Sequence, residues 1–323
     1  MDEFKFSENK LDNTKLTDFK TCPRKFFYSH VLGWRTQTPN IHLVFGTAWH
    51  EAMEYLLLNG YGETQVLRAF EKFLGAFHEE IPPELGNLNK KKNPDKAFVA
   101  LAKYVSYPPY QKDLETFETL YTEIAGKIMI DDVFSLYFRQ DSILRNRETG
   151  NVRSREHKTG SSNWLWDEQW TLSGQVGVYS HVLNCLFPND KVDGVEMNGV
   201  FFSAAKNPRI EDMFHRFMIC KTKDQMQTWI DNTRFYMWEI QREYRLLNEA
   251  TENDQTLSAF PLRDTSCVNY GKVCEFHDFC LAWPNPLRYC SEPPIGFVKY
   301  FWDPTAREAK KTFEFHVDQL PEV

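Results

Sequence analysis

The chain has 323 residues, of which 42 % are hydrophobic and 15 % aromatic, and its formal net charge is -7. These values exclude an intrinsically disordered chain and a protein coated in basic surface, but they leave room for a local basic groove. The N-terminal MDEFKFSENK carries acids where a signal peptide carries bases, and no apolar run reaches the length of a membrane span. We therefore expect an intracellular, cytoplasmic protein with no membrane partner.

Helical patterns dominate the first third of the sequence. Thr17 or Asp18 is a suitable cap for a short helix, and Pro23 is tolerated in the first turn of a second one that carries RKFFYSHVL. In GTAWHEAMEYLLLNG, residues 46 to 60, apolar side chains recur at helical spacing and Asn59-Gly60 supplies a stop. Two further helices are predicted over about residues 62 to 80 and 94 to 106.

The pattern changes near residue 132. VFSLYFRQDSILRN and NVRSREHKTG predict two strands joined by a turn at residues 148 to 151, which is a hairpin. A helix from about 174 to 186, strands at VEMNGVFFSA and MFHRFMICKT, and a helix from about 223 to 248 follow. This order predicts an α/β fold in which helices flank a mixed central β-sheet.

Acidic and basic side chains converge on this hairpin. Glu156 and Lys158 are two residues apart on one strand and therefore share a face, whereas His157 points the other way. The hairpin can bring Asp141 beside Glu156, and two carboxylates close together suit Mg²⁺ or Mn²⁺. Each residue also has an ordinary structural role open to it, such as a strand end for Asp141 or a turn at Lys158.

The helix after the hairpin carries Gln175 and Tyr179 four residues apart, so that both lie on one face. Both side chains can donate a hydrogen bond to a phosphate. For Tyr179 the alternative is a place in the core.

Seven cysteines raise the question of a ligand site, and an odd count in a reducing compartment argues against a disulfide framework. Cys267, Cys274 and Cys280 follow the pattern C-x6-C-x5-C, whereas a closed thiolate site needs four ligands. Cys22 and Cys290 are both available as the fourth, and four local cysteines would suit structural zinc. We interpret Cys185 and Cys220 as ordinary core thiols.

Five segments in order, namely TDFKTCPRKFFYSHV, FGTAWHEAMEYL, FRQDSIL, REHKTG and QVGVY, followed by the cysteine triplet, resemble the RecB-type nucleases of the PD-(D/E)XK superfamily. Within that superfamily they are similar to the iron-sulfur branch, which includes the AddB nuclease domain, the iron-sulfur nuclease of CRISPR adaptation and phage relatives. The resemblance implies a [4Fe-4S] cluster that joins the N- and C-terminal segments. Its ligands would be Cys22, Cys267, Cys274 and Cys280.

The resemblance also implies roles for individual residues. His50, Asp141 and Glu156, with the backbone carbonyl of His157, would hold one or two Mg²⁺ or Mn²⁺ ions. Lys158 would be the catalytic lysine that orients the attacking water. Gln175 and Tyr179 would contact DNA beside the scissile phosphate.

The function implied is a metal-dependent DNA nuclease, an exonuclease acting on single-stranded DNA or DNA ends in phage or bacterial recombination or processing. Alternatives are a CRISPR-adaptation-type nuclease that trims ends, and a non-catalytic iron-sulfur or zinc protein that binds DNA. The chain has no G-x4-G-K-[ST] motif, so a helicase would be a separate partner. The location expected is the cytoplasm of a bacterial cell or of a phage-infected host.

Basic residues near the cysteine site and in the lysine-rich loop at 86 to 96 are candidates for DNA backbone contacts. They are Lys15, Lys20, Arg24, Lys25, Lys90, Lys91, Lys92 and Lys96. The aromatic Phe26, Phe27 and Tyr28 could stack on bases, although a core position is the commoner role.

We predict one nuclease domain over residues 1 to 323. Its parts are a mainly helical region at 1 to 125, the catalytic sheet and helices at 126 to 260, a cluster-binding segment at 261 to 290 and a tail at 291 to 323.

Overall fold

The computed structural model describes residues 4–6, 10–206, 208–269 and 271–319. The chain divides into two compact units, each assembled from three separate segments. The first unit comprises residues 1–38, 126–138 and 227–308, and the second comprises residues 39–125, 139–226 and 309–323.

The main sheet has seven strands and mixed pairing. Its order is β11-β3-β4-β5-β6-β7, with β1 pairing in parallel with β4. Strands β4 and β5 form the predicted antiparallel hairpin, β5 and β6 are parallel, and β6 and β7 are antiparallel. The strands are β1 (Leu11–Asp12), β3 (Phe117–Met129), β4 (Ser135–Asn146), β5 (Val152–Gly160), β6 (Val192–Phe201), β7 (Phe214–Ile219) and β11 (Lys311–His316). The expected α/β fold with a mixed central sheet flanked by helices is confirmed.

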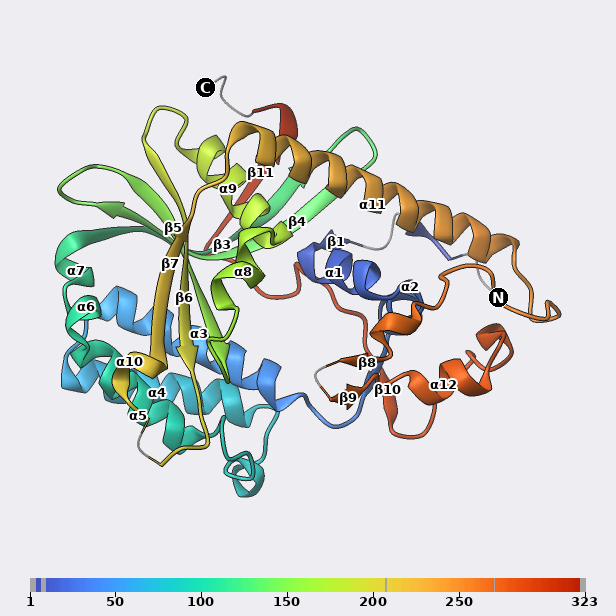
Figure 1. Ribbon diagram of the computed structural model, residues 1–323, viewed down its shortest axis with the longest axis horizontal. Helices are drawn as coiled ribbons and strands as arrows, with labels where there is room; N and C mark the ends of the chain where they lie inside the picture. Colours follow the sequence, from blue (N-terminus) through green and yellow to red (C-terminus); the bar gives the residue numbers. More distant parts are fainter. Residues whose placement is uncertain (1–3, 7–9, 207, 270, 320–323) are drawn as a thin grey trace. The chain divides into compact units, whose positions relative to one another are not determined.

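Helices α3 (Ile41–Asn59), α4 (Glu63–His78) and α5 (Pro94–Ser106) pack together in the second unit, as Figure 1 shows. The apolar stripe of α3 faces the core, because its residues at helical spacing are buried from Val44 to Leu56. Phe45 and Trp49 on this stripe contact Phe202, which follows strand β6. This core fixes α3, and with it His50, against the sheet.

Helix α9 (Gly174–Leu186) lies on the face of the main sheet opposite to helix α5. The amide of Asn198 on β6 bonds both His157 on β5 and the hydroxyl of Tyr104 on α5. Glu156, the neighbour of His157, instead bonds Gln175 on α9. Because adjacent residues of a strand point to opposite faces, α5 and α9 lie on opposite faces of the sheet.

Short helices connect these elements in the second unit. They are α6 (Pro108–Gln111), α7 (Asp113–Thr116), α8 (Trp166–Thr171) and α10 (Ile210–Met213).

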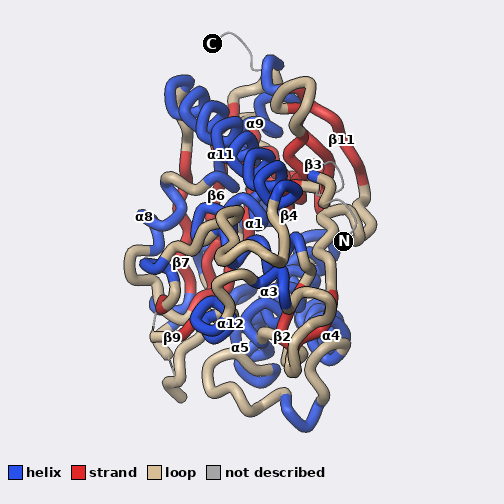
Figure 2. Tube along the Cα trace, turned by 90° about the vertical axis from the view of Figure 1, so that its right-hand side faces the viewer, coloured by secondary structure: helices blue, strands red, loops and turns tan. Residues whose placement is uncertain are grey.

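The first unit joins the N-terminal helices to the cysteine-rich segment. Strand β2 (Trp34–Thr36) pairs antiparallel with β10 (Phe297–Lys299), and β8 (Val268–Asn269) pairs with β9 (Lys272–Val273). Among the described residues, the α-helices assigned wholly to this unit are α1 (Asn13–Thr21), α2 (Pro23–Phe26) and α12 (His277–Ala282), and α11 (Lys223–Glu249) lies mostly in it. Figure 2 shows α11 as one unbroken helix.

Phe26, Phe27 and Tyr28 belong to the core of the first unit, since all three have no exposed surface. Phe26 stacks on Phe260 at a centroid distance of 5.9 Å, and Tyr28 stacks on Phe276 at 5.1 Å. The proposal that they stack on bases is therefore wrong, and the alternative of a core position is confirmed.

The helices predicted from periodicity agree closely with those observed. Those at 94 to 106 and 174 to 186 coincide with α5 and α9, and the one at 62 to 80 matches α4 within two residues at each end. Strands β3 and β11 have no counterpart among the predicted elements. Among the described residues, no helix has both the length and the apolar character needed to cross a bilayer.

Candidate metal centre and cysteine pocket

The β4–β5 hairpin places Asp141 against the strand that carries Glu156. Ser142 pairs with Arg155 across the two strands, so Asp141 comes next to Glu156 in the same register. The Oδ2 atom of Asp141 accepts a hydrogen bond of 2.8 Å from the backbone N–H of His157. The turn at residues 148 to 151 therefore brings the two acids together as predicted.

His50 reaches the same place from helix α3. Its Nδ1 lies 3.0 Å from Oδ1 of Asp141. Burial disfavours a charged imidazole, but the Asp141 carboxylate outweighs this and raises the pKa of His50. Burial equally disfavours the carboxylate of Asp141, yet the charge and hydrogen bond of His50 hold its pKa well below the usual range. An imidazole and a carboxylate so placed are metal-ligand types.

Glu123 on strand β3 is a fourth ionisable group at this site, and it is not among the site residues predicted from the sequence. One ligand atom from each of His50, Glu123 and Asp141 lies within 4.8 Å of the other two. Burial, reinforced by the charge of Asp141, raises the pKa of Glu123 to about 7. No motif marks this residue, because nothing in the sequence of strand β3 distinguishes it from Glu118, the other acid of the same strand.

Glu156 is 2 % exposed, and only one of its two carboxylate oxygens has hydrogen-bond partners among the described residues. Its Oε1 accepts hydrogen bonds from Nζ of Lys158 at 2.6 Å and from Nε2 of Gln175 at 3.0 Å. Its Oε2 is buried with no hydrogen-bond partner among the described residues. Burial and the charge of Asp141 raise the pKa of this carboxyl. Because a buried unpaired oxygen is costly, the site has the chemistry of one that receives a cation.

Lys158 lies at the edge of this cluster, with its side chain 22 % exposed. Its ammonium is 5.2 Å from the centroid of the Trp170 ring, on helix α8. The lysine is therefore held between a carboxylate and an aromatic face while part of it stays accessible.

Tyr179 is buried, at 3 % exposed, and its hydroxyl donates to the backbone carbonyl of Arg139 at 2.7 Å while accepting from Nε2 of Gln175 at 2.6 Å. The hydroxyl is therefore engaged within the protein, and a direct DNA contact by Tyr179 stays a prediction. Gln175 is half-buried and links Tyr179 to Glu156. Its contact with DNA stays a prediction.

His157 points away from Glu156, as the strand pattern predicted. Its ring pairs with Asn198 and burial lowers its pKa to about 3, so the imidazole is neutral. The role of its backbone carbonyl as a metal ligand stays a prediction.

Arg24 and Lys25 both bond to other groups of the protein. Arg24 is 6 % exposed, and its guanidinium donates to the carbonyls of residues 257, 259 and 260. Lys25 pairs with Asp18 at 3.2 Å and lies 3.9 Å from Glu275. Both cations are thus engaged within the protein, although the Lys25 side chain is 28 % exposed, and their contacts with DNA stay predictions.

Of the other basic residues predicted to contact DNA, some are buried or bonded within the protein and some are exposed. Lys92 is 4 % exposed and donates to Oγ1 of Thr159 at 2.8 Å, and Lys15 is 4 % exposed. Lys20 lies over the Tyr236 ring, and Lys96 bonds the carbonyl of Ala205. Lys90 and Lys91 are exposed and remain available.

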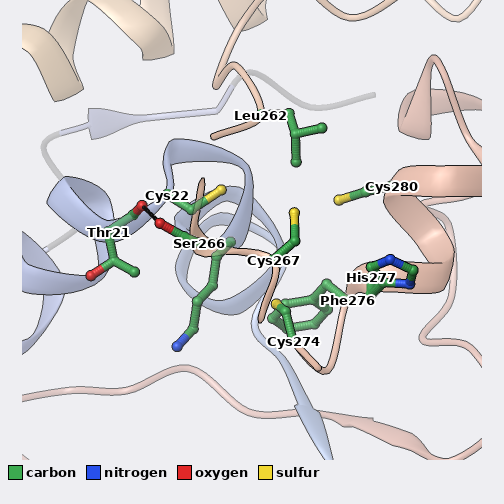
Figure 3. Close-up of a pocket in the computed structure, with 10 residues that line it drawn as sticks. Thr21, Cys22, Leu262, Ser266, Cys267, Cys274, Phe276, His277 and Cys280 are labelled. Carbon is green, nitrogen blue, oxygen red and sulfur yellow. Dashed lines mark hydrogen bonds between the residues drawn. The ribbon is translucent and has the colours of Figure 1, made fainter. Parts of the chain in front are cut away.

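Four of the seven cysteines line one pocket in the first unit: Cys22, Cys267, Cys274 and Cys280. Figure 3 shows the sulfur atoms of Cys22, Cys267 and Cys280 turned toward the same space, with Cys274 beside Phe276. Cys22 stands between α1 and α2, Cys267 and Cys274 flank the β8–β9 pair, and Cys280 lies on α12. Burial raises the pKa of the Cys280 thiol to about 11.

The remaining cysteines lie elsewhere. Cys290 is absent from the lining of this pocket, and its sulfur is 3.4 Å from the carbonyl oxygen of Leu287. Cys185 is half-buried, with its sulfur 3.4 Å from His181 Nε2. Cys220 is exposed, so the interpretation of it as a core thiol is wrong.

A family model described as the PD-(D/E)XK nuclease superfamily matches residues 13–281. That range contains the whole His50, Glu123, Asp141, Glu156 and Lys158 set and the four cysteines of the pocket. No curated protein matches the sequence.

Proposed function

Since this chain belongs to the PD-(D/E)XK nuclease superfamily, we propose that it is a metal-dependent deoxyribonuclease. The observation that carries the proposal is that Asp141, His50 and Glu156 come together beside the ammonium of Lys158. One carboxylate oxygen of the buried Glu156 has no hydrogen-bond partner among the described residues. These groups fit a divalent ion, either Mg²⁺ or Mn²⁺, with imidazole favouring Mn²⁺. Such an ion supplies a bound water of lowered pKa and offsets charge on the phosphate.

The protein's own groups would divide the work as follows. His50, Asp141 and Glu156 hold the ion, and the carbonyl of His157 is a further candidate ligand. Lys158 is accessible enough to donate to a phosphate oxygen or to the attacking water, and its charge favours the developing negative charge. Gln175 holds Glu156 in place through its 3.0 Å hydrogen bond, and Tyr179 in turn holds Gln175.

The substrate proposed is single-stranded DNA or a DNA end, which makes the enzyme an exonuclease in DNA recombination or processing. A helicase would be a separate partner. The exposed Lys90 and Lys91, in the loop that leads to Lys92 on Thr159, support a path for the phosphate backbone near the end of strand β5.

The test uses end-labelled linear DNA, in single- and double-stranded form, with Mn²⁺, Mg²⁺ or EDTA. Cleavage should require the ion and should be lost in Lys158→Ala, while Lys191→Ala, at an exposed lysine of the same unit, should cleave like wild type. Cleavage that persists in EDTA or in Lys158→Ala would refute the mechanism. Circular single-stranded DNA separates the two modes, because an exonuclease leaves it intact.

For the cysteine pocket we propose a [4Fe-4S] cluster held by Cys22, Cys267, Cys274 and Cys280. The support is that these four thiols, from segments far apart in the sequence, line one pocket. Cysteine must be deprotonated to bind, so burial that raises the thiol pKa also makes binding release protons. A cluster here would tie the N-terminal helices to the C-terminal segment of the first unit.

This part is tested by anaerobic purification followed by visible absorbance and by iron, sulfide and zinc analysis. A broad brown absorbance with four irons per chain is the expected result. Cys22→Ser should lose the colour and Cys290→Ser should keep it. A colourless protein that contains zinc would replace the cluster by a zinc site.

A further inference from the structure

Glu123 occupies a backbone conformation that needs an explanation. It lies within strand β3, yet its φ of +48° is in the left-handed region, which residues with a side chain rarely adopt. Its carbonyl accepts a hydrogen bond from the backbone N–H of Lys310 at 3.2 Å. The kink turns one residue of an otherwise regular strand.

The Glu123 side chain stands in an unfavourable electrostatic position. It is 13 % exposed and has a ligand atom within 4.8 Å of one on Asp141 and one on His50. Arg139 offers its guanidinium at 3.3 Å, a long contact. Two partly buried carboxylates this close repel each other, and a divalent cation between them reverses the sign of that interaction.

Asp141 is arranged to serve such a cation on its Glu123 side. Its Oδ2 is engaged by the N–H of His157, while Oδ1 faces Nδ1 of His50 at 3.0 Å. An ion that replaces the proton between Nδ1 and Oδ1 would find the Glu123 carboxylate as its next neighbour. Within the described residues this close group consists of His50, Glu123 and Asp141 and does not include Glu156.

We propose that Glu123 is a ligand of the divalent ion bound by His50 and Asp141, in addition to the acids of the β4–β5 hairpin. The inference rests on the proposed function, because it concerns the same metal centre. One imidazole and two carboxylates form a mixed nitrogen and oxygen set, which favours Mn²⁺ over the strictly oxygen-preferring Mg²⁺. Arg139 holds the carboxylate until the ion arrives.

The test is Mn²⁺ binding to metal-free protein, followed by titration calorimetry and by the loss of the free Mn²⁺ electron-paramagnetic-resonance signal. Glu123→Gln keeps the shape of the side chain and removes its charge. It should weaken Mn²⁺ binding at least about 10-fold, the lower bound found even for groups that only support a metal ligand. Glu118→Gln, at an exposed acid of the same strand, should bind like wild type. Wild-type affinity in Glu123→Gln overturns the inference.

Thermal unfolding separates a ligand from a purely structural residue. In EDTA, Glu123→Gln should melt at or above the wild-type temperature, because repulsion with Asp141 is relieved. The rise of the melting temperature on adding Mn²⁺ should shrink, since ligand binding stabilises only through its affinity. If Glu123→Gln melts below wild type in EDTA, Glu123→Asp decides, and an unchanged Mn²⁺ affinity with this shorter acid overturns the inference.

The outcome is separable from that of the nuclease proposal. A wild-type protein that cleaves DNA while Glu123→Gln binds Mn²⁺ normally removes Glu123 from the site and leaves the nuclease intact. Mn²⁺ binding that depends on Glu123 in a protein that cleaves no nucleic acid keeps the inference and removes the nuclease.

Discussion

The ammonium of Lys158 lies 2.6 Å from Oε1 of Glu156, and this lysine is the main positive charge beside the buried acid. Removing one partner of a buried pair costs about 3–5 kcal/mol, and the lower end applies here because Lys158 is 22 % exposed. Lys158→Met should therefore lower the melting temperature in EDTA. Saturating Mn²⁺ should restore most of it, since a bound cation supplies the missing charge.

Differential scanning calorimetry with and without Mn²⁺ measures this prediction. Lys191→Met is the matched control and should melt like wild type in both conditions. If Mn²⁺ stabilises wild type but leaves Lys158→Met as unstable as in EDTA, Lys158 and the ion do not share Glu156.

Gln175 is expected to orient Glu156, a proposed metal ligand, and Tyr179 is expected to hold Gln175 in place. Gln175→Leu removes the 3.0 Å hydrogen bond to Glu156 and should lower kcat about 10- to 100-fold, as for other groups that orient a ligand. KM for DNA should change little. Tyr179→Phe should cost about 1 kcal/mol of stability and have a smaller kinetic effect.

Steady-state kinetics at two salt concentrations provide the measurement. A residue that binds the phosphate backbone would raise KM and reduce the salt dependence when removed. That behaviour in Tyr179→Phe would show that the buried hydroxyl becomes accessible and contacts DNA after all.

Asp113 is expected to be a major stability determinant of the second unit. Its carboxylate accepts hydrogen bonds from Arg155 at 2.8 Å and from Arg216 at 2.6 Å, and it is 5 % exposed. Asp113→Asn leaves two close guanidinium groups with less compensation and should cost about 3–5 kcal/mol. Chemical denaturation measures this loss.

Asp212→Asn is the control for Asp113, because Asp212 belongs to an exposed ion pair with Arg209. Surface pairs contribute little to stability, so its midpoint should barely move. Equal effects of the two variants would contradict the assignment of the buried pair as a stabilising element.

Acid should destabilise the second unit through His181. This side chain has no exposed surface, and burial lowers its pKa to about 4 from the usual 6.5. The unfolded chain binds the proton first, so stability falls as pH drops from about 6.5 toward 4, by about 3 kcal/mol for this group. Above pH 6.5 His181 contributes no slope.

His181→Gln should flatten part of the pH dependence of unfolding between pH 4 and 6.5. His157, whose pKa is lowered to about 3, still contributes a slope of the same sign, and Glu123, whose pKa is raised to about 7, contributes one of opposite sign. Urea denaturation at several pH values gives the measurement, and an unchanged slope in His181→Gln would show that the imidazole is not buried neutral.

Local patterns predicted most of the elements that position the metal centre. Helix α9 and the β4–β5 hairpin follow from periodicity and turn residues, which act within a few residues of one another. The hairpin alone is enough to place Asp141 near Glu156. The role of His50 could be predicted only from the family resemblance, since the sequence around a histidine beside an apolar stripe does not indicate what the side chain contacts.

Residues whose role depends on distant partners could not be predicted. Arg24 is basic in sequence, but its guanidinium is used by carbonyls more than 230 positions away. Glu123 likewise depends on a strand kink and on the packing of α3. Charge can be read along the chain, whereas burial is set by tertiary packing.

The pattern of segments in the two units has a consequence for biosynthesis. The polypeptide crosses from one unit to the other five times, after residues 38, 125, 138, 226 and 308. Strand β11, which pairs at the edge of the main sheet, lies beyond the last crossing. Neither unit can be excised as a continuous fragment. A ribosome must therefore deliver residue 316 before the sheet is complete, so the nascent chain depends on protection from aggregation until then.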